Sequence, residues 1–337
     1  MTELAPHLAT FLREHLPYER KASFHTCAAY AYSFQLLVRF AASRLKIPPC
    51  RLNVEQLDAP LVLEFLKHIE SERHNSARTR NARLAAINSF FRFLEYRLPS
   101  CLDQSRRIHA IPVKKIDERL IAHLTRQEIK TLLNAPDPRS KLGIRDRAML
   151  HLAFAAGLRV SELISLRLEH LDDQACSSVR IMGKGRRERV LPLWKETATT
   201  LRAWLAIRPR DRCPELFPNA AGRAMTRSGF EYIVAKYAAS AALSEPSIAQ
   251  KRVTPHVLRH SCALHTLQAT RDIRKVSLWL GHASVQSTEI YLRADPTEKL
   301  EALTTFAPVG LKRGRFQAPD KLLAMLKDVS APKNYAD

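Results

Sequence analysis

The sequence predicts a mainly α-helical protein with a small β-sheet, organised as a helical N-terminal domain followed by an α+β domain. Apolar residues recur at helical spacing in both halves of the chain, and one stretch has the pattern of two short strands. The chain has 337 residues, of which 46% are hydrophobic, so it is long enough for two domains that each bury a core. We expect domains at 1–105 and 123–310, a basic linker at 106–122 and a C-terminal tail at 311–337.

Helical periodicity is clearest in two stretches of the first domain. Each stretch places four apolar residues on one helical face. The two sets are Tyr30, Phe34, Leu37 and Ala41, and Leu84, Ile87, Phe91 and Leu94. Ser76 is placed to cap the second helix at its N-terminus.

The charge of the chain indicates a polyanionic partner. The formal net charge is +21, which on a folded chain favours nucleic acid or an anionic membrane over general solubility. No apolar run is long enough to cross a bilayer, and the first residues lack the order of a secretory signal. We therefore expect nucleic acid as the partner and no membrane association.

The cysteines and glycines exclude several classes of chemistry. None of the six cysteines forms a CxxC pair, so a disulfide framework or zinc ribbon is not expected, and reduced thiols fit a cytoplasmic protein. No Gly-rich phosphate loop is present, which argues against ATP-driven chemistry. His256, His260, Cys262 and His265 lie close together, but no second ligand pair accompanies them, so we expect no metal and no cofactor.

The second domain has recognisable helix ends. Thr125 and Glu128 form a capping box at the start of a helix. A helix near 146–156 should stop at Gly157, which tolerates a left-handed backbone. Arg159 follows at once, with Ser161 able to cap the next helix. Arg159 is thus expected in a short corner between two helices.

A β-hairpin follows, and basic residues occur at its tip and elsewhere. Residues 178–182 and 189–193 are the two strands, joined through Gly183-Lys184-Gly185-Arg186. Basic side chains at this tip, in the linker and near the start of the helix that follows Ser76 are either solvated or in contact with phosphates. The candidates for phosphate contact are Arg78, Arg80, Arg83, Lys114, Lys115 and Arg186.

Four features of the second domain carry candidate chemistry. They are the corner at Arg159, the hairpin residue Lys184, the pair His256 and Arg259 spaced to share a helix face, and Leu280-Gly281-His282 followed nine residues later by Tyr291. Each feature alone is more often surface or core structure. Together, in this order and spacing, they indicate a catalytic site.

These motifs resemble those of the tyrosine recombinase family, the phage integrase-type site-specific recombinases, and more narrowly the integrases of bacterial mobile elements. The resemblance covers most of the chain. It implies a helical DNA-clamping N-terminal domain with a SAM-like fold and a catalytic domain. It also implies six catalytic residues, with Tyr291 as the nucleophile: Arg159, Lys184, His256, Arg259, His282 and Tyr291.

The residue types suit the reaction that the resemblance implies, attack of a phenol oxygen on a DNA phosphodiester. Arg159 and Arg259 would hold the non-bridging oxygens with always-charged donors, and His282 would add a hydrogen bond. His256 would accept the proton of Tyr291 or position it. Lys184 would protonate the leaving 5′-oxygen. Glu162 is either a buried partner of Arg159 or a surface residue.

The resemblance also implies partners and leaves alternatives. The expected partner is double-stranded DNA in the bacterial cytoplasm, bound by a homo-oligomer, a tetramer of two dimers, with or without sister recombinases. The expected process is DNA integration or transposition through a Holliday junction. The alternatives are relaxation of DNA by a type IB topoisomerase-like activity and a catalytically inactive DNA-binding regulator. We expect an apolar stripe in the tail to dock either on its own domain or on a neighbouring protomer. The stripe consists of Leu322, Met325, Leu326 and Val329.

Overall fold

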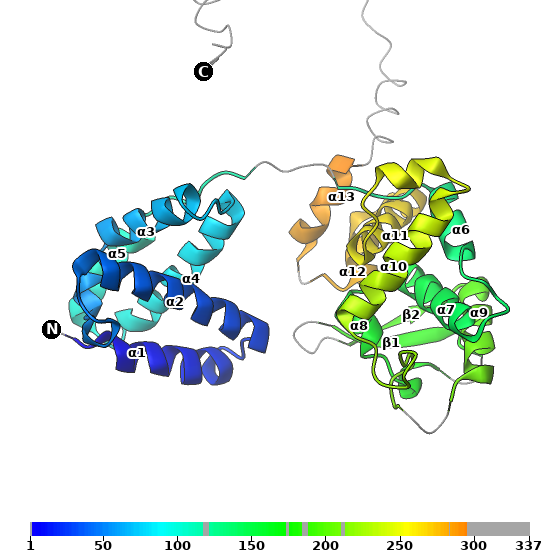
Figure 1. Cartoon of the computed structure of the whole chain (residues 1–337), viewed down its shortest axis with the longest axis horizontal. Helices are drawn as coiled ribbons and strands as arrows, with labels where there is room; N and C mark the ends of the chain where they lie inside the picture. Colours follow the sequence, from blue (N-terminus) through cyan, green and yellow to red (C-terminus); the bar gives the residue numbers. More distant parts are fainter. Residues whose placement is uncertain are drawn as a thin grey trace, which may run out of the picture. The chain divides into compact units, whose positions relative to one another are not determined.

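The computed structural model describes residues 2–116, 121–172, 175–183, 188–209, 213–282 and 284–294. These residues form two compact units, one up to residue 116 and one from residue 121 (Figure 1). The structure is mainly helical with a two-stranded sheet, as the sequence predicts. No described helix combines the length and the hydrophobicity that a transmembrane span needs.

The first unit is entirely helical in its described part. Its main elements are α1 (Leu4–Thr10), the π-helical η1 (Phe11–Glu19), α2 (Phe24–Leu45), α3 (Ala59–Ser71), α4 (Ala77–Glu95) and α5 (Leu102–His109). The two predicted helices are confirmed as α2 and α4, and Ser76 caps α4 by accepting the Thr79 amide at 3.3 Å. Edge-to-face rings fill the core between them, with Phe90 contacting both Phe11 and Phe34.

The predicted linker begins later than residue 106. Helix α5 continues to His109, and Ile108 and Ile111 are buried in the first core. Beyond the helix, the Pro112 carbonyl accepts a hydrogen bond from Arg80 at 2.7 Å, and Asn81 bonds to Lys114. The sequence analysis missed the helix end because the basic residues around Ile108 obscure its short apolar repeat. The chain therefore stays attached to α4 at least as far as residue 114.

The second unit combines a group of packed helices with the hairpin. Its main elements are α6 (Arg126–Asn134), α7 (Lys141–Ala155), α8 (Val160–Ile164), β1 (Ser178–Met182), β2 (Glu188–Pro192), α9 (Lys195–Ile207), α10 (Arg227–Ala242), α11 (Pro255–Thr270), α12 (Ile273–Leu280) and α13 (Glu289–Ala294). Strands β1 and β2 pair antiparallel, with Ile181 opposite Arg189. The hairpin tip at 184–187 and the tail at 311–337 lie outside the described residues.

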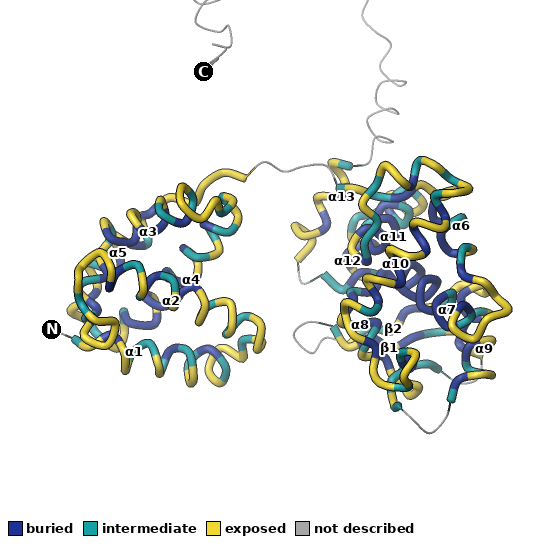
Figure 2. The backbone as a smooth tube through the Cα atoms, in the orientation of Figure 1, coloured by how far each residue is buried: buried dark blue, intermediate teal, exposed yellow. Residues whose placement is uncertain are grey.

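Helix α7 lies at the centre of this unit and positions the segment that follows it. Its residues are buried on all sides from Ala148 to Ala155, against α9 and α11 among others (Figure 2). The helix stops at Gly157, where φ is +56° and a Cβ atom would lie 2.6 Å from Leu280 Cδ2. Only glycine fits both this left-handed backbone and this close approach. The start of α8 is thereby held against the end of α12.

The caps at the two helix starts give one confirmation and one correction. Thr125 and Glu128 form the predicted capping box at α6. Ser161 is not the N-cap of α8. The cap is Arg159, whose amide donates to the Glu162 carboxylate at 3.0 Å. Helix α8 starts earlier than predicted because a carboxylate three residues on satisfies this free amide.

Candidate active site

Tyr291 on α13 is buried, with 2% of its surface exposed, and it lies between two histidines. The hydroxyl forms a hydrogen bond of 3.0 Å with Nδ1 of His260 on α11. The ring of His282, which follows α12, is nearly parallel to the Tyr291 ring at 6.5 Å and 9°. A segment near the end of the described chain is thus brought against α11 and α12.

The protonation of these groups follows from their burial. Burial raises the pKa of Tyr291 to about 12, although the charges of Arg259 and Arg159 act to lower it. Burial, and then neighbouring positive charge, lowers the pKa of both His260 and His282 to about 4. At neutral pH the phenol is therefore protonated and both imidazoles are neutral. A neutral His260 with a free ring nitrogen is able to accept the phenol proton.

Arg259 is held rigidly by backbone carbonyls. Its guanidinium donates to Gly157 O at 2.5 Å and to Leu280 O at 2.9 Å, and the residue is 4% exposed. Burial and the nearby charge of Arg159 lower the pKa of Arg259 to about 10, so it remains charged at neutral pH. The ends of α7 and α12 therefore fix a permanent positive charge beside Tyr291.

One buried carboxylate, that of Glu162, faces three arginines, and we call these four residues the Glu162 cluster. Arg159 donates to its Oε1 at 2.7 Å. Arg189 of β2 donates to Oε2 at 2.9 Å and to Oε1 at 3.3 Å, and Arg259 Nη1 lies 3.8 Å from Oε2. Three positive charges against one negative charge leave a net excess that favours an anion. Glu162 is the buried partner, not the surface residue, of the two sequence alternatives.

The arginines also keep Glu162 charged. Burial acts to raise the pKa of Glu162, but the hydrogen bonds from Arg189 and from the Arg159 amide, together with the charges of both arginines, lower it below its usual value. A carboxylate that stays ionised while buried needs partners of this kind.

The structure brings together four of the six predicted catalytic residues: Arg159, Arg259, His282 and Tyr291. His256 is exposed and stacks on His260 at 6.3 Å, and the hydroxyl of Tyr291 has His260 as its hydrogen-bond partner instead. Lys184 lies outside the described residues.

The sequence analysis missed two residues of the site, His260 and Arg189. The helical spacing of four between His256 and His260 places both on one face of α11, which was a usable signal. Arg189 lies two residues from the buried Leu191 on β2, so the two side chains share the inward face of the strand. Inward direction was predictable from strand alternation, but the partner of Arg189 was not.

Two of the predicted phosphate contacts on α4 have protein partners in the structure. Arg80 is 4% exposed and bonds to the Pro112 carbonyl, so it serves the path of the chain and not an external anion. Arg83 donates to Ser33 Oγ at 2.9 Å and lies over the Tyr32 ring. The positions of Arg80 and Arg83 on α4 direct both side chains toward the rest of the first unit. The closely spaced arginines in the sequence did not indicate this direction.

The other basic residues predicted to contact phosphate differ in whether their side chains are exposed and unpaired with protein groups. Arg78 and Lys115 are exposed. Lys114 Nζ lies 2.9 Å from Glu70 in a surface ion pair, the kind of pair that contributes little stability. Arg186 lies outside the described residues.

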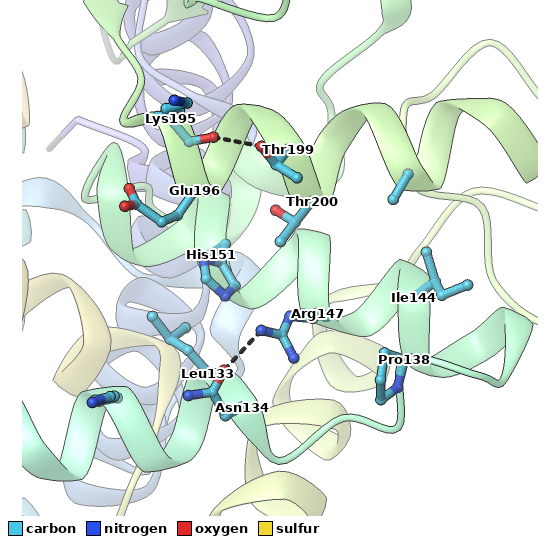
Figure 3. A pocket seen from close by; sticks show the side chains of 12 residues that line it. Leu133, Asn134, Pro138, Ile144, Arg147, His151, Lys195, Glu196, Thr199 and Thr200 are labelled. Atoms are coloured by element: carbon cyan, nitrogen blue, oxygen red, sulfur yellow. Dashed lines mark hydrogen bonds between the residues drawn. The ribbon is translucent and has the colours of Figure 1, made fainter.

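A cavity of about 800 Å³ lies between α6, α7 and α9, and it shares no lining residue with the Glu162 cluster or Tyr291. Figure 3 shows His151 in its wall and Arg147 donating to Asn134, a bond of 2.7 Å. Burial lowers the pKa of His151 to about 4. Within the described ranges, no group of three or more His, Cys, Asp or Glu is placed to hold a metal ion.

Comparison with known families identifies the class of protein. Residues 122–298 match the phage integrase family, and residues 9–97 match the phage integrase N-terminal SAM-like domain. The chain therefore belongs to the phage integrase family of tyrosine recombinases, whose activity is site-specific recombination.

Individual relatives cover nearly the whole chain. The y4rC protein of Sinorhizobium fredii, whose name includes the words integrase/recombinase, is 42% identical over 97% of this chain and 98% of its own length. The y4rD protein of the same organism is 37% identical over 80% and 97%. The tyrosine recombinase XerC of Pelotomaculum thermopropionicum is 34% identical over 85% and 92%.

Solved structures share the fold at lower identity. A XerH site-specific recombinase bound to its difH substrate has a TM-score of 0.64 and 22% identity, covering 87% of this chain and 83% of its own. The Tn1549 transposon integrase in complex with transposon end DNA has a TM-score of 0.63 and 15% identity, covering 88% and 98%.

The Glu162 cluster predicts a pH-dependent stability effect. Glu162→Gln should lower the unfolding free energy at pH 7 by about 3 kcal/mol, because three guanidiniums lose their buried counter-charge. The folded-state pKa of Glu162 is lowered, so this contribution is full above its unfolded pKa of about 4.3 and is lost as pH falls through the folded value. Denaturant unfolding of both proteins at pH 7 and below pH 4 measures the difference.

Glu169→Gln is the matched control, since Glu169 pairs with Arg167 at the surface. It should be near neutral at both pH values. A Glu162→Gln variant as stable as wild type at pH 7, or a stability gap that persists undiminished in acid, contradicts the role given to this carboxylate.

Proposed function

We propose that this tyrosine recombinase cuts and rejoins double-stranded DNA through a covalent 3′-phosphotyrosyl link to Tyr291, passing through a Holliday junction. The observation that supports this is the convergence on one buried phenol of groups from three separate segments: Arg159 at the start of α8, Arg259 and His260 on α11, and His282 after α12. A surplus of fixed positive charge beside a neutral nucleophile suits attack on a phosphodiester, where negative charge accumulates in the transition state.

The first step exchanges one phosphodiester for another. The Tyr291 oxygen attacks phosphorus, the bond from phosphorus to the 5′-oxygen breaks, and the 5′-strand leaves as a hydroxyl. Its proton comes from Lys184 as general acid. Arg159 and Arg259 hold the non-bridging oxygens, and His282 adds a hydrogen bond. Rejoining is the reverse step by a 5′-hydroxyl, so the cycle needs no ATP.

The phenol proton needs an acceptor, because a phenol with a pKa near 12 is almost entirely protonated at neutral pH. His260 is 3.0 Å from the hydroxyl and is neutral, so we assign it as the acceptor in the described state. His256 stacks on His260 and remains a proposed member of the site. An incoming phosphate offsets the positive charge of Arg259, one of the causes that lower the His260 pKa, so His260 becomes a better acceptor when substrate is bound. The phenol proton then passes to His260 as the bond from oxygen to phosphorus forms, and Lys184 supplies the proton of the leaving 5′-hydroxyl.

The partner and assembly follow from the relatives and the charge. XerH and the Tn1549 integrase were solved bound to DNA, and lambda integrase was solved as a tetramer at a Holliday junction. The net charge of +21 fits the same polyanion. We propose that this chain binds DNA as a dimer on each site and recombines as a tetramer.

A mobile element is the proposed context. One structural relative is a transposon integrase, and two sequence relatives, y4rC and y4rD, come from one organism. The presence of both in one organism supports action together with sister recombinases.

Tyr291→Phe tests the reaction directly. The substrate is a duplex that the protein selects from a random-sequence pool, and we call it the selected site. It is made as a series of duplexes that each carry one nick at a different position across the centre. Cleavage next to a nick releases a short strand that diffuses away and leaves the covalent complex trapped. Tyr291→Phe should bind it as wild type does and form no covalent complex on a denaturing gel, because only the attacking oxygen is lost. His260→Gln should slow the formation of that complex by about 100-fold.

Tyr237→Phe is the matched control, since Tyr237 is also buried and donates its hydroxyl to Asp146. It should lose stability and keep covalent complex formation. A covalent band in Tyr291→Phe overturns the nucleophile. Wild-type binding without any covalent band favours a DNA-binding regulator, and relaxation of a supercoiled plasmid that lacks the selected site favours a topoisomerase.

The basic residues of the first unit predict a specific salt dependence. Arg78→Ala with Lys115→Ala should weaken DNA binding and flatten the plot of log affinity against log salt by about 2, because each lost phosphate contact removes about 0.9 from the slope. Fluorescence anisotropy from 50 to 300 mM salt, about a sixfold range, measures it.

Arg80→Ala is the comparison, because Arg80 is buried against Pro112. It should cost about 1–3 kcal/mol of stability and leave the salt slope unchanged. A slope that changes in Arg80→Ala but not in the double variant would reverse our assignment of these residues.

A further inference from the structure

Arg189 on β2 has no role in the reaction proposed above, yet within the Glu162 cluster its side chain donates two hydrogen bonds to Glu162, where that of Arg159 donates one. Its side chain is 11% exposed and donates Nη2 to Oε2 of Glu162 at 2.9 Å and Nη1 to Oε1 at 3.3 Å. Two parallel bonds from one planar guanidinium fix the angle of a carboxylate as well as its position. Glu162 is therefore oriented from the sheet as well as from its own helix.

Arg189 also lies against the turn that precedes His282. A Cβ atom at Gly281 would come within 2.7 Å of Arg189 Nη1 and 3.1 Å of its Cδ, and Gly281 has a φ of +62°. The arginine thus occupies the space that a side chain at residue 281 would need. It joins three segments that are distant in sequence: β2, the start of α8 and the turn after α12.

The consequence concerns Arg159. In the described ranges Arg159 makes one side-chain hydrogen bond, from Nη1 to Glu162, and its side chain is 31% exposed. Arg189 uses both carboxylate oxygens, which limits the acceptor capacity left for a second bond from Arg159. Nε and Nη2 of Arg159 then stay available for an anion.

We propose that Arg189 is a positioning residue of this recombinase: it shares Glu162 with Arg159, which keeps the Arg159 guanidinium free for the scissile phosphate, and it supports the turn that presents His282. The inference rests on the proposed cleavage by Tyr291. In it Arg189 contacts neither the DNA nor the reacting atoms.

Charge counting makes the proposal specific. The cluster carries three positive charges and one negative charge, a net of two. Arg189→Met reduces the net charge to one and leaves Glu162 free to bind Arg159 at two points. Glu162→Gln in that background restores the net charge of two and removes the carboxylate that draws Arg159 away. A loss that a second substitution reverses is not the behaviour of two independent structural defects.

The experiment measures the single-turnover rate of covalent complex formation on the selected site at saturating protein, together with DNA affinity and thermal unfolding. Arg189→Met should slow cleavage by about 100-fold, since displacing a catalytic group by about 1 Å has effects of this size. Its DNA affinity should be unchanged. Arg189→Lys should be intermediate, and Glu162→Gln with Arg189→Met should cleave faster than Arg189→Met alone.

Arg180→Met is the control on the same hairpin, because Arg180 is 61% exposed and pairs with Glu188. It should cleave at the wild-type rate. If Arg189→Met does not fold, Arg189→Lys with and without Glu162→Gln carries the same comparison. Wild-type cleavage by Arg189→Met, or additive losses in the double variant, overturns the proposal. Failure of wild type itself to form the complex overturns the proposed function instead.

Discussion

The catalytic unit depends on one interaction, the binding of a single buried carboxylate by three guanidiniums. Glu162 caps α8 through the Arg159 amide and at the same time bonds to Arg159, Arg189 and, at longer range, Arg259. Taking these charges out of water costs free energy. Their mutual contacts offset that cost only when the charged groups are paired and hydrogen-bonded at good geometry. Because the arginines outnumber the carboxylate, the cluster keeps a net positive charge that favours an anion.

The remaining features of the site place the neutral phenol of Tyr291 beside that charge. Gly157 lets the end of α7 approach α12 closely, and the carbonyls of Gly157 and Leu280 hold Arg259. Burial keeps Tyr291 protonated and His260 neutral, so a phenol and a neutral imidazole lie in hydrogen-bond contact. Side chains that are preorganised in this way need little rearrangement during a reaction.

The sequence predicted the helices and the hairpin because these depend on local patterns, and four of the six residues proposed as catalytic lie together in the structure. Periodicity located α2 and α4, and the Thr125 and Glu128 pattern located the start of α6. The contacts of Arg80 and Arg189 were not predictable, because an arginine in a sequence carries no sign of whether water, phosphate or a distant carbonyl receives its hydrogen bonds. Those partners lie 32 and 27 residues away along the chain.

We propose that the phenol oxygen of Tyr291 forms the covalent bond to DNA, and the attachment point can be located directly. The complex trapped on the selected site can be digested with trypsin and nuclease and its peptides sequenced by mass spectrometry. The tryptic peptide Val276–Arg293 contains one tyrosine beside several hydroxyl-bearing residues, so fragment ions are needed to assign the nucleotide to one side chain. We expect a nucleotide joined through its 3′-phosphate to Tyr291. A nucleotide on any other side chain, or one joined through its 5′-phosphate, contradicts it.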